Sequence, residues 1–336
     1  MTTVLPAFVD LPDLAGERFG STVIAANDEF FAPKEGLIKA NAPEWREGVY
    51  TERGKWMDGW ETRRRRTPGY DWAIVRLGLP GVVRGVVIDT SFFTGNYPPR
   101  ASLEACSILG TPSTDALTGG ETAWWSLLES VDLDGNTKNH FPIEKSERVT
   151  HVRLNIVPDG GVARLRLHGD VQPDPRIFAP DHDVDLAAMS NAGFVVACSD
   201  MHYGHRQNLI LPDRSTHMGD GWETKRRRGP GHDWTIVRLG RRGSVQRIEL
   251  DTDHFKGNAP GSCMLEYCDA HATAGASVFE PDAEQWRTLL PESALQPHTR
   301  HIFESVAPNA ATHVRLNIYP DGGVARLRLI GRATST

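Results

Sequence analysis

The chain has 336 residues, of which 24% are charged and 39% hydrophobic, and its formal net charge is −6 at pH 7. This composition is ordinary for a soluble globular protein and is long enough for two hydrophobic cores. The acidic balance argues against nucleic acid as the main partner, because phosphate binding requires a basic field. No apolar run approaches the roughly 18 residues of a membrane span. We therefore expect neither a nucleic-acid partner nor a membrane.

Two further features indicate a cytoplasmic protein. The acidic residues of the N-terminal segment, MTTVLPAFVDLPDLAGERFG, do not fit a signal peptide. The four cysteines, at positions 106, 198, 263 and 268, are too few and too irregularly spaced for a disulfide framework or a zinc ribbon. A reducing compartment is expected.

The chain contains one long stretch twice. Residues 58–98 recur at 220–260 with a constant offset of 162 residues, and 25 of the 41 positions are identical. The offset holds as far as HVRLNIVPDGGVARLRLHG at 151–169, which recurs at 313–331. Two copies of about 160 residues fall in the size range of domains and not of solenoid repeats. The sequence therefore predicts one domain used twice.

The copies give the domain boundaries. Asp13 and Asp28 match Asp185 and Asp200 at an offset of 172, so the first copy is ten residues longer between Asn41 and 57, which predicts a surface loop there. Residues 170–184 are rich in proline and aspartate, and they predict a linker. The predicted division is a first domain at 1–169 and a second at 185–336.

Within each copy the residue pattern is that of strands. Residues 72–77 are bulky or β-branched, 82–88 form a short apolar run, and 151–156 alternate strictly between apolar and polar side chains. The turn at 158–161 precedes a second alternating segment at 163–168, which predicts an antiparallel hairpin with one solvated face. Short helices are predicted at 121–130 and 282–290. Together, these strand patterns predict an all-β fold of two tandem β-sandwiches, of jelly-roll type.

The repeated motifs also resemble a known family. DGWET followed by a basic run, DW.IVRLG, DT..F.GN.P and THVRLNI.PDGGVARLRL are together similar to the allantoicases, over nearly the whole chain. The resemblance implies two jelly-roll domains like galactose-binding modules, homo-oligomerisation, and hydrolysis of the small molecule allantoate to ureidoglycolate and urea in purine catabolism.

A site for allantoate has definite requirements. The substrate carries a carboxylate and two ureido groups on one carbon, so a site needs an arginine fork for the carboxylate and oxygen acceptors for the ureido N–H groups. It also needs an acid for the departing urea, and a base or a metal to activate water. No HExxH, HxH or CxxC motif is present, and the sequence leaves open whether a divalent metal ion takes part.

Residues kept in both copies supply the candidate binding groups. Among the repeated arginines, Arg64, Arg65, Arg226 and Arg227 are the best candidates for the substrate carboxylate, with Glu223 and Asn258 as partners for the ureido groups. The alternative is structural, namely an ion-pair ladder with neighbouring carboxylates and ordinary turn positions. Persistence in both copies favours the structural alternative, since a fold must be maintained twice and a site once.

Positions that differ between the copies supply the candidate catalytic groups. Tyr70 is replaced by His232, Ser91 by Asp253 and Phe92 by His254. These lie near Asp233 and Asp251, and histidine is suited to proton transfer near neutral pH. We expect His232, His254, Asp233, Asp251 and Asp253 to supply the acid and base. A non-catalytic sugar- or ligand-binding sandwich and a catalytically silent paralogue remain as alternatives.

Overall fold

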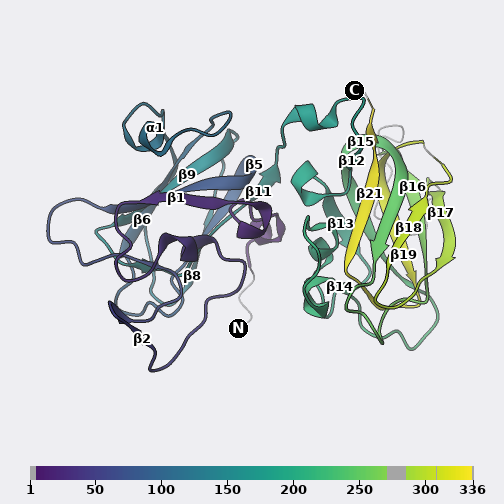
Figure 1. The fold of residues 1–336 in the computed structure, drawn as a ribbon, viewed down its shortest axis with the longest axis horizontal. Helices are drawn as coiled ribbons and strands as arrows, with labels where there is room; N and C mark the ends of the chain where they lie inside the picture. The colour runs from purple at the N-terminus through teal and green to yellow at the C-terminus, as the bar shows by residue number, and fades with distance from the viewer. Residues whose placement is uncertain (1–4, 271–284, 308, 335–336) are drawn as a thin grey trace. The chain divides into compact units, whose positions relative to one another are not determined.

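The computed structural model describes residues 5–270, 285–307 and 309–334. The chain forms two compact units, Met1–Gln172 and Pro173–Thr336, and strands make up most of the regular secondary structure of each (Figure 1). Both units are jelly-roll β-sandwiches, as the alternating sequence pattern predicts. Within the described residues, no helix is long and apolar enough to cross a membrane.

The strands of the first unit are β1 (Thr22–Ala26), β2 (Tyr50–Thr51), β3 (Gly54–Lys55), β4 (Trp60–Glu61), β5 (Asp71–Asp89), β6 (Arg100–Cys106), β7 (Trp125–Asp132), β8 (Lys138–Pro142), β9 (Arg148–Val157), β10 (Gly161–Val162) and β11 (Arg164–Val171), with helix α1 at Thr114–Thr118. The strands of the second unit are β12 (Val184–Asp185), β13 (Phe194–Cys198), β14 (Trp222–Glu223), β15 (Asp233–Asp251), β16 (Ser262–Cys268), β17 (Arg287–Ala294), β18 (Arg300–Glu304), β19 (Ala310–Tyr319), β20 (Gly323–Val324) and β21 (Arg326–Ala333).

One long strand organises each unit. The sequence predicts two strands at 72–77 and 82–88, but the structure joins them into β5, and β15 is its counterpart in the second unit. The first half of β5 pairs with β1 and β9, and the second half pairs with β11 and β8. The register shifts between Arg76 and Gly81, and neighbouring backbone comes close at Gly78 and Gly81, where a Cβ would lie 2.3 Å from the Phe19 oxygen and 2.2 Å from the Asp170 oxygen.

The predicted hairpin at 151–168 is wrong. β9 pairs with β5 and β6, whereas β11 pairs with the other half of β5, so the two strands do not pair with each other. The Pro-Asp-Gly-Gly turn is thus a connection between β-layers. Alternation along a strand shows which face is apolar, but it does not show which strand lies alongside, and that was the source of the error.

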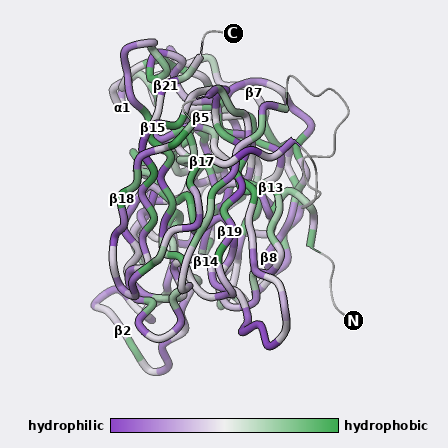
Figure 2. Tube along the Cα trace, turned by 90° about the vertical axis from the view of Figure 1, so that its right-hand side faces the viewer, coloured by the Kyte–Doolittle hydropathy of each residue, from purple (hydrophilic) through white to green (hydrophobic). Residues whose placement is uncertain are grey.

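The apolar face of each strand is buried as predicted. Val152, Leu154 and Ile156 of β9 have no exposed surface, and the same holds for Leu165 and Leu167 of β11. Figure 2 shows hydrophobic and hydrophilic residues interleaved along the strands. Burial of such side chains stabilises the fold by about 1.5–3 kcal/mol each.

The polar face, however, is not simply solvated. Arg164 is buried, and its guanidinium donates to the Asp58 carboxylate at 2.7 Å and to the backbone oxygens of Asn41 and Gly36. Burial acts to raise the pKa of Asp58, but the donors around its carboxylate, Arg164 foremost, outweigh this effect and hold the pKa below its usual value. The pair ties β11 to the loop before β4.

The predicted surface loop is confirmed, but the two predicted short helices are not. The ten-residue insertion lies on the surface and contains the exposed hairpin of β2 and β3. The helix predicted at 121–130 is wrong, because β7 begins at Trp125 and the nearby helix is α1. Of the second predicted helix, residues 282–284 lie outside the described residues, and the remainder enters β17. In both places a segment with a large apolar residue leads into a strand, β7 or β17, and does not form a helix.

The segment predicted as a linker at 170–184 is shorter in the structure. β11 extends to Val171, and Val184 already pairs with β21. The boundary between the compact units falls between Gln172 and Pro173.

The buried histidine of β9 makes the first unit sensitive to acid. His151 is 1% exposed, and burial lowers its pKa from 6.5 to about 4. The unfolded chain therefore binds more protons between these two values, so the free energy of unfolding must fall as the pH drops through this window, by up to roughly 3 kcal/mol. We expect His151→Gln to reduce this loss, as measured by calorimetry of the first-unit transition between pH 7 and pH 4. The partly exposed His140 of the same unit serves as the control in a His140→Gln variant, and an undiminished loss in His151→Gln would contradict the assignment.

Candidate functional site

A small charged cavity of about 220 Å³ lies in the second unit. Its lining residues are Pro212, Asp213, Arg214, Glu249, Asp251, Arg300, Arg326 and Arg328. Four guanidinium groups and three carboxylates therefore face one space. The volume is below the roughly 300–1,000 Å³ of sites for drug-sized ligands, so the cavity suits a small polar molecule with an anionic group.

Two adjacent strands place the acidic side of the cavity. Glu249 and Asp251 are two residues apart at the end of β15, which directs their side chains to the same face. Arg300 of β18 lies opposite Asp251 in the register and forms an ion pair with Glu249. Arg247 forms a second ion pair with Glu249 at 3.3 Å. Glu249 is thus paired with two cations.

Arg326 of β21 anchors the opposite wall. Its buried guanidinium lies 2.9 Å from the Asp213 carboxylate and 3.2 Å from the Asp220 carboxylate. Its Nε donates to the Asp213 backbone oxygen at 2.8 Å. Arg164 holds Asp58 in the same way in the first unit, so this contact belongs to the shared fold. Its local consequence is to fix Asp213 at the cavity wall.

Arg328, on the cavity wall, has unused hydrogen-bonding capacity. Its Nη2 donates to the backbone oxygens of Pro212 and Asp213, and its Nε lies 3.7 Å from the Asp185 carboxylate. Its Nη1 is buried and has no hydrogen-bond partner within the described residues. The matching Nη1 of Arg166 in the first unit donates to Asp13. Burial lowers the pKa of Arg328, but an arginine remains charged at neutral pH.

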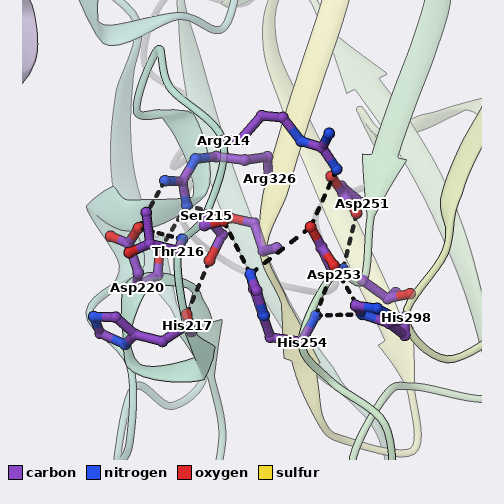
Figure 3. Close-up of polar contacts among 12 residues, drawn as sticks. Arg214, Ser215, Thr216, His217, Asp220, Asp251, Asp253, His254, His298 and Arg326 are labelled. Atoms are coloured by element: carbon purple, nitrogen blue, oxygen red, sulfur yellow. Dashed lines mark hydrogen bonds and ion pairs between the residues drawn. The ribbon is translucent and has the colours of Figure 1, made fainter.

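Beside the cavity, Asp253 is surrounded by proton donors (Figure 3). The Asp253 amide donates to Asp251 Oδ1 at 2.8 Å, which links the two carboxylates through the backbone. The Asp253 carboxylate lies 3.2 Å from Arg214 Nη2, 2.8 Å from His298 Nδ1 and 3.8 Å from His254 Nε2. His254 Nε2 also lies 2.9 Å from the Ser215 oxygen, and since a carbonyl only accepts, this nitrogen carries the proton.

The contacts of His298 are compatible with gain and loss of a proton. Its Nδ1 lies 2.8 Å from the His254 amide and 2.8 Å from Asp253 Oδ1. Without a proton, Nδ1 accepts from that amide. With a proton it donates to Asp253, and the amide then has Asp253 Oδ1 at 3.1 Å as its acceptor. Both states are therefore satisfied, as a proton-transfer group requires.

The first unit has the same backbone here and different side chains. Phe92 and His254 both have φ of 69°, and Asn136 and His298 have φ of 51° and 52°. The Phe92 amide donates to Asn136 Oδ1 at 2.8 Å, as the His254 amide does to His298. The turn is thus a property of the fold, whereas the imidazoles belong to the second unit.

The first unit keeps only part of this charged set. The positions of Asp213, Glu249, Arg300, Asp253, His254 and His298 are taken there by Asn41, Val87, Lys138, Ser91, Phe92 and Asn136. Trp45 of the ten-residue insertion packs on Phe92, with 5.8 Å between ring centroids. An aromatic contact thus replaces the polar cluster.

Three of the predicted residues lie together at this site. Asp251 lines the cavity, and Asp253 and His254 adjoin it. His232 is elsewhere: its Nε2 lies 3.0 Å from Asn317 Oδ1, and its ring packs on Tyr319.

The remaining predicted residues are in structural contacts or on the surface. Asp233 accepts from Ser199 and Arg227, and Arg65 forms the equivalent pair with Asp71 at 2.6 Å. Arg64 and Arg226 are exposed. None of these four arginines lines the cavity.

Glu223 and Asn258 contact each other and not the cavity. Asn258 Nδ2 donates to Glu223 Oε1 at 2.6 Å, and Asn96 donates to Glu61 at 2.7 Å in the first unit. The repeated bond joins the loop after each long strand to the short strand β14 or β4.

Sequence reasoning missed Arg214, Glu249, His298, Arg300, Arg326 and Arg328. A signal existed for two of them. Glu249 replaces Val87 and His298 replaces Asn136, which is the same kind of difference that singled out Asp253. Arg326 and Arg328 are arginine in both copies, so comparison of the copies cannot find them.

The metal-ligating side chains and the buried cysteines have plain structural settings. Within the described residues, no group of three or more histidines, cysteines, aspartates or glutamates is arranged to hold a metal ion. Burial raises the pKa of Cys106 and Cys268 to about 11 and that of Cys263 to about 12, so these thiols are not thiolates near neutral pH.

Comparison with known proteins agrees with this architecture. A family model described as the allantoicase repeat matches residues 12–172 and 184–334. The chain is 50% identical over 322 residues to a probable allantoicase of Pseudomonas aeruginosa (strain LESB58), covering 95% of both chains. It is 47% identical over 336 residues to a probable allantoicase of Pseudomonas fluorescens, covering 99% of both. The crystal structure of allantoicase from Saccharomyces cerevisiae superposes with a TM-score of 0.77 at 36% identity, covering 95% of this chain and 92% of that one. The chain belongs to the allantoicase family.

Proposed function

We propose that this protein hydrolyses allantoate to ureidoglycolate and urea, and that the reaction takes place in the charged cavity of the second unit. Family membership supports the reaction. The observation that carries the location is the combination, in one unit alone, of an unpaired arginine nitrogen with a carboxylate–imidazole cluster. A small anion and a proton-transfer step need these two features.

The reaction sets the number of groups required. A water oxygen bonds to the central carbon of allantoate, one C–N bond breaks, and urea leaves. One proton goes from the water to a base, and one proton goes from an acid to the departing nitrogen. Two proton-transfer groups and one anion-binding group therefore suffice.

We assign the carboxylate of the substrate to Arg328 and the base to Asp251. Arg328 Nη1 is a charged donor without a partner in the described structure, and a charge-assisted hydrogen bond there would satisfy it. Asp251 lines the same cavity, and one of its oxygens is already held by the Asp253 amide. That bond orients the carboxylate.

The acid comes from the cluster around Asp253. His254 and His298 both lie against the Asp253 carboxylate, which holds the two imidazoles at the edge of the cavity. A positioned acid or base contributes about 10²–10⁴-fold in rate. The first unit, with Ser91 and Phe92 at these positions, then serves as scaffold.

We further propose a cytoplasmic homo-oligomer. The cysteines are free, which suits a reducing compartment, and oligomerisation is what the family resemblance implies. Light scattering of the purified protein tests the oligomer.

The assignment of the base is tested by a matched pair of variants. Asp251→Asn keeps an oxygen that accepts from the Asp253 amide, so the fold should survive, but the amide cannot take a proton. We expect kcat for urea release from allantoate to fall by about 10²–10⁴-fold. Asp89→Asn changes the equivalent residue of the first unit, and its activity should stay within about threefold, since Asp89 makes the same amide contact without a cavity function. Equal losses in both variants would show that the aspartate acts on the fold.

The arginine assignment predicts an effect on substrate binding. Arg328→Lys keeps a positive charge but removes the planar fork, so KM for allantoate should rise by about tenfold or more, the loss of one charge-assisted hydrogen bond. Steady-state urea release measures it. Arg166→Lys in the first unit is the control, and KM should not change there. An unchanged KM in a folded Arg328→Lys variant would remove Arg328 from the site.

The inequality of the units is tested at the shared turn. Asparagine tolerates a φ of 69°, so His254→Asn should fold, and we expect urea release to fall by about 10²-fold or more. Phe92→His places an imidazole at the same turn of the first unit, where Asp253 has no counterpart carboxylate, and should leave the rate unchanged. If His254→Asn retains the wild-type rate, His254 is not the acid. If the wild-type protein binds allantoate but releases no urea from it, the protein is a binding module.

A further inference from the structure

The first unit contains a second cavity, of about 380 Å³, with the opposite chemistry. Its lining residues are Tyr70, Ser102, Leu103, Glu104, Ser126, Leu128, Glu129, Ser130, Asn155 and Val157. None of them is cationic, and most of their polar atoms are carboxylate, hydroxyl or amide oxygens. A ligand that fits this lining has to supply hydrogen-bond donors.

One buried acceptor in this lining lacks a partner. Asn155 of β9 is 5% exposed, and its Nδ2 donates to Glu104 Oε2 at 2.9 Å and to Ser102 Oγ at 3.3 Å. Its Oδ1 is buried and has no hydrogen-bond partner in the part of the chain that the structure describes. An unsatisfied buried polar atom costs about 1–3 kcal/mol. The amide is therefore held rigidly and presents an unused acceptor.

The second unit shows what this acceptor binds. Asn317 is the counterpart of Asn155, and its Nδ2 donates to Glu266 at 2.9 Å in the same manner. Its Oδ1, however, accepts from His232 Nε2 at 3.0 Å. The first unit has Tyr70 at the position of His232. The same amide thus has an imidazole N–H partner in one unit and none in the other.

We propose that the cavity of the first unit binds a small molecule with a planar N–H donor, an imidazole or a cyclic ureide, which bonds Asn155 Oδ1 as His232 bonds Asn317. Further donors of the ligand reach Glu104 or Glu129, both of which line the same cavity. The oxygen is shielded from water, so entry requires a lining side chain to move. Tyr70, which is 43% exposed, has the freedom to do so.

The nearest cation does not compete for this site. Arg153 lies beside the cavity, but its guanidinium is bound to Glu104 at 2.7 Å and stacked 5.1 Å from the Trp124 ring centroid. The ligand class therefore differs from that of the arginine-lined cavity in the second unit. The proposal does not rest on the hydrolase activity, since every residue named here belongs to the first unit or to the His232 contact.

The test uses imidazole and hydantoin as probes of the intact protein. Saturation-transfer NMR titrations measure affinity, and a crystal soak locates the probe. We expect at least one probe to bind the wild type and to lie against Asn155. A probe of so few atoms cannot exceed about 1.5 kcal/mol per heavy atom, so Kd is expected in the micromolar to millimolar range.

A substitution taken from the other copy supplies the control. Tyr70→His provides the internal imidazole that His232 provides in the second unit, so it should weaken probe binding by about tenfold or more, the loss of one hydrogen bond to a buried acceptor. Tyr70→Phe leaves Asn155 Oδ1 available and should bind like the wild type. Urea release should stay at the wild-type rate in both variants, which separates this site from the catalytic one. Failure of both probes to bind the wild type, unchanged affinity in Tyr70→His, or a probe found away from Asn155 in the soak would each overturn the proposal.

Discussion

A buried guanidinium on the closing strand of each unit is the contact on which the surrounding loops depend. Arg164 and Arg326 are 1% and 3% exposed, and desolvating such a charge costs several kcal/mol unless it is paired. Each is satisfied by a carboxylate and by backbone oxygens of the loop before β4 or β14. Because the guanidinium donates its hydrogen bonds in fixed directions, the loop that supplies the acceptors is held to one path. In the second unit this same loop carries Asp213 and Arg214 to the cavity wall, so a stability contact positions part of the candidate site.

The two units show how one scaffold is given unequal chemistry. The long strand, the turn with positive φ and the buried arginine are common to both. Side chains on that frame then differ: a valine, a phenylalanine and a tryptophan from the insertion in the first unit, and a glutamate, two histidines and an aspartate in the second. The first combination gains apolar contact area, whereas the second places opposite charges around a small space. Neither requires a change of backbone, which explains how duplication allowed one copy to diverge.

The sequence predicted the architecture well and the pairing less well. The constant offset and the alternation of apolar residues were sufficient for two β-sandwiches, since period-two patterning specifies which face of a strand is buried. The connection at 158–161 was read as a hairpin because turn chemistry is the same for a hairpin and for a link between layers. The segment around Trp124 suggested a helix because short segments with large apolar residues fit both periods. Long-range pairing, which local pattern does not contain, decided both cases.

For the site, comparison of the copies was informative but incomplete, and the reason is physical. A residue that differs between copies is free of the shared fold, and this logic found Asp253 and His254. It also selected His232, which completes the hydrogen bonding of a neighbouring asparagine and lies outside the arginine-lined cavity. Conversely, Arg328 is arginine in both copies and lies near the matching aspartate in both, but Arg166 donates to Asp13 through Nη1, whereas Arg328 approaches Asp185 through Nε and leaves its Nη1 without a partner in the described residues. The candidate binding group is thus a residue of the shared fold that meets its aspartate through a different nitrogen in the second unit. Such a difference in geometry changes no letter of the sequence and is visible only in the structure.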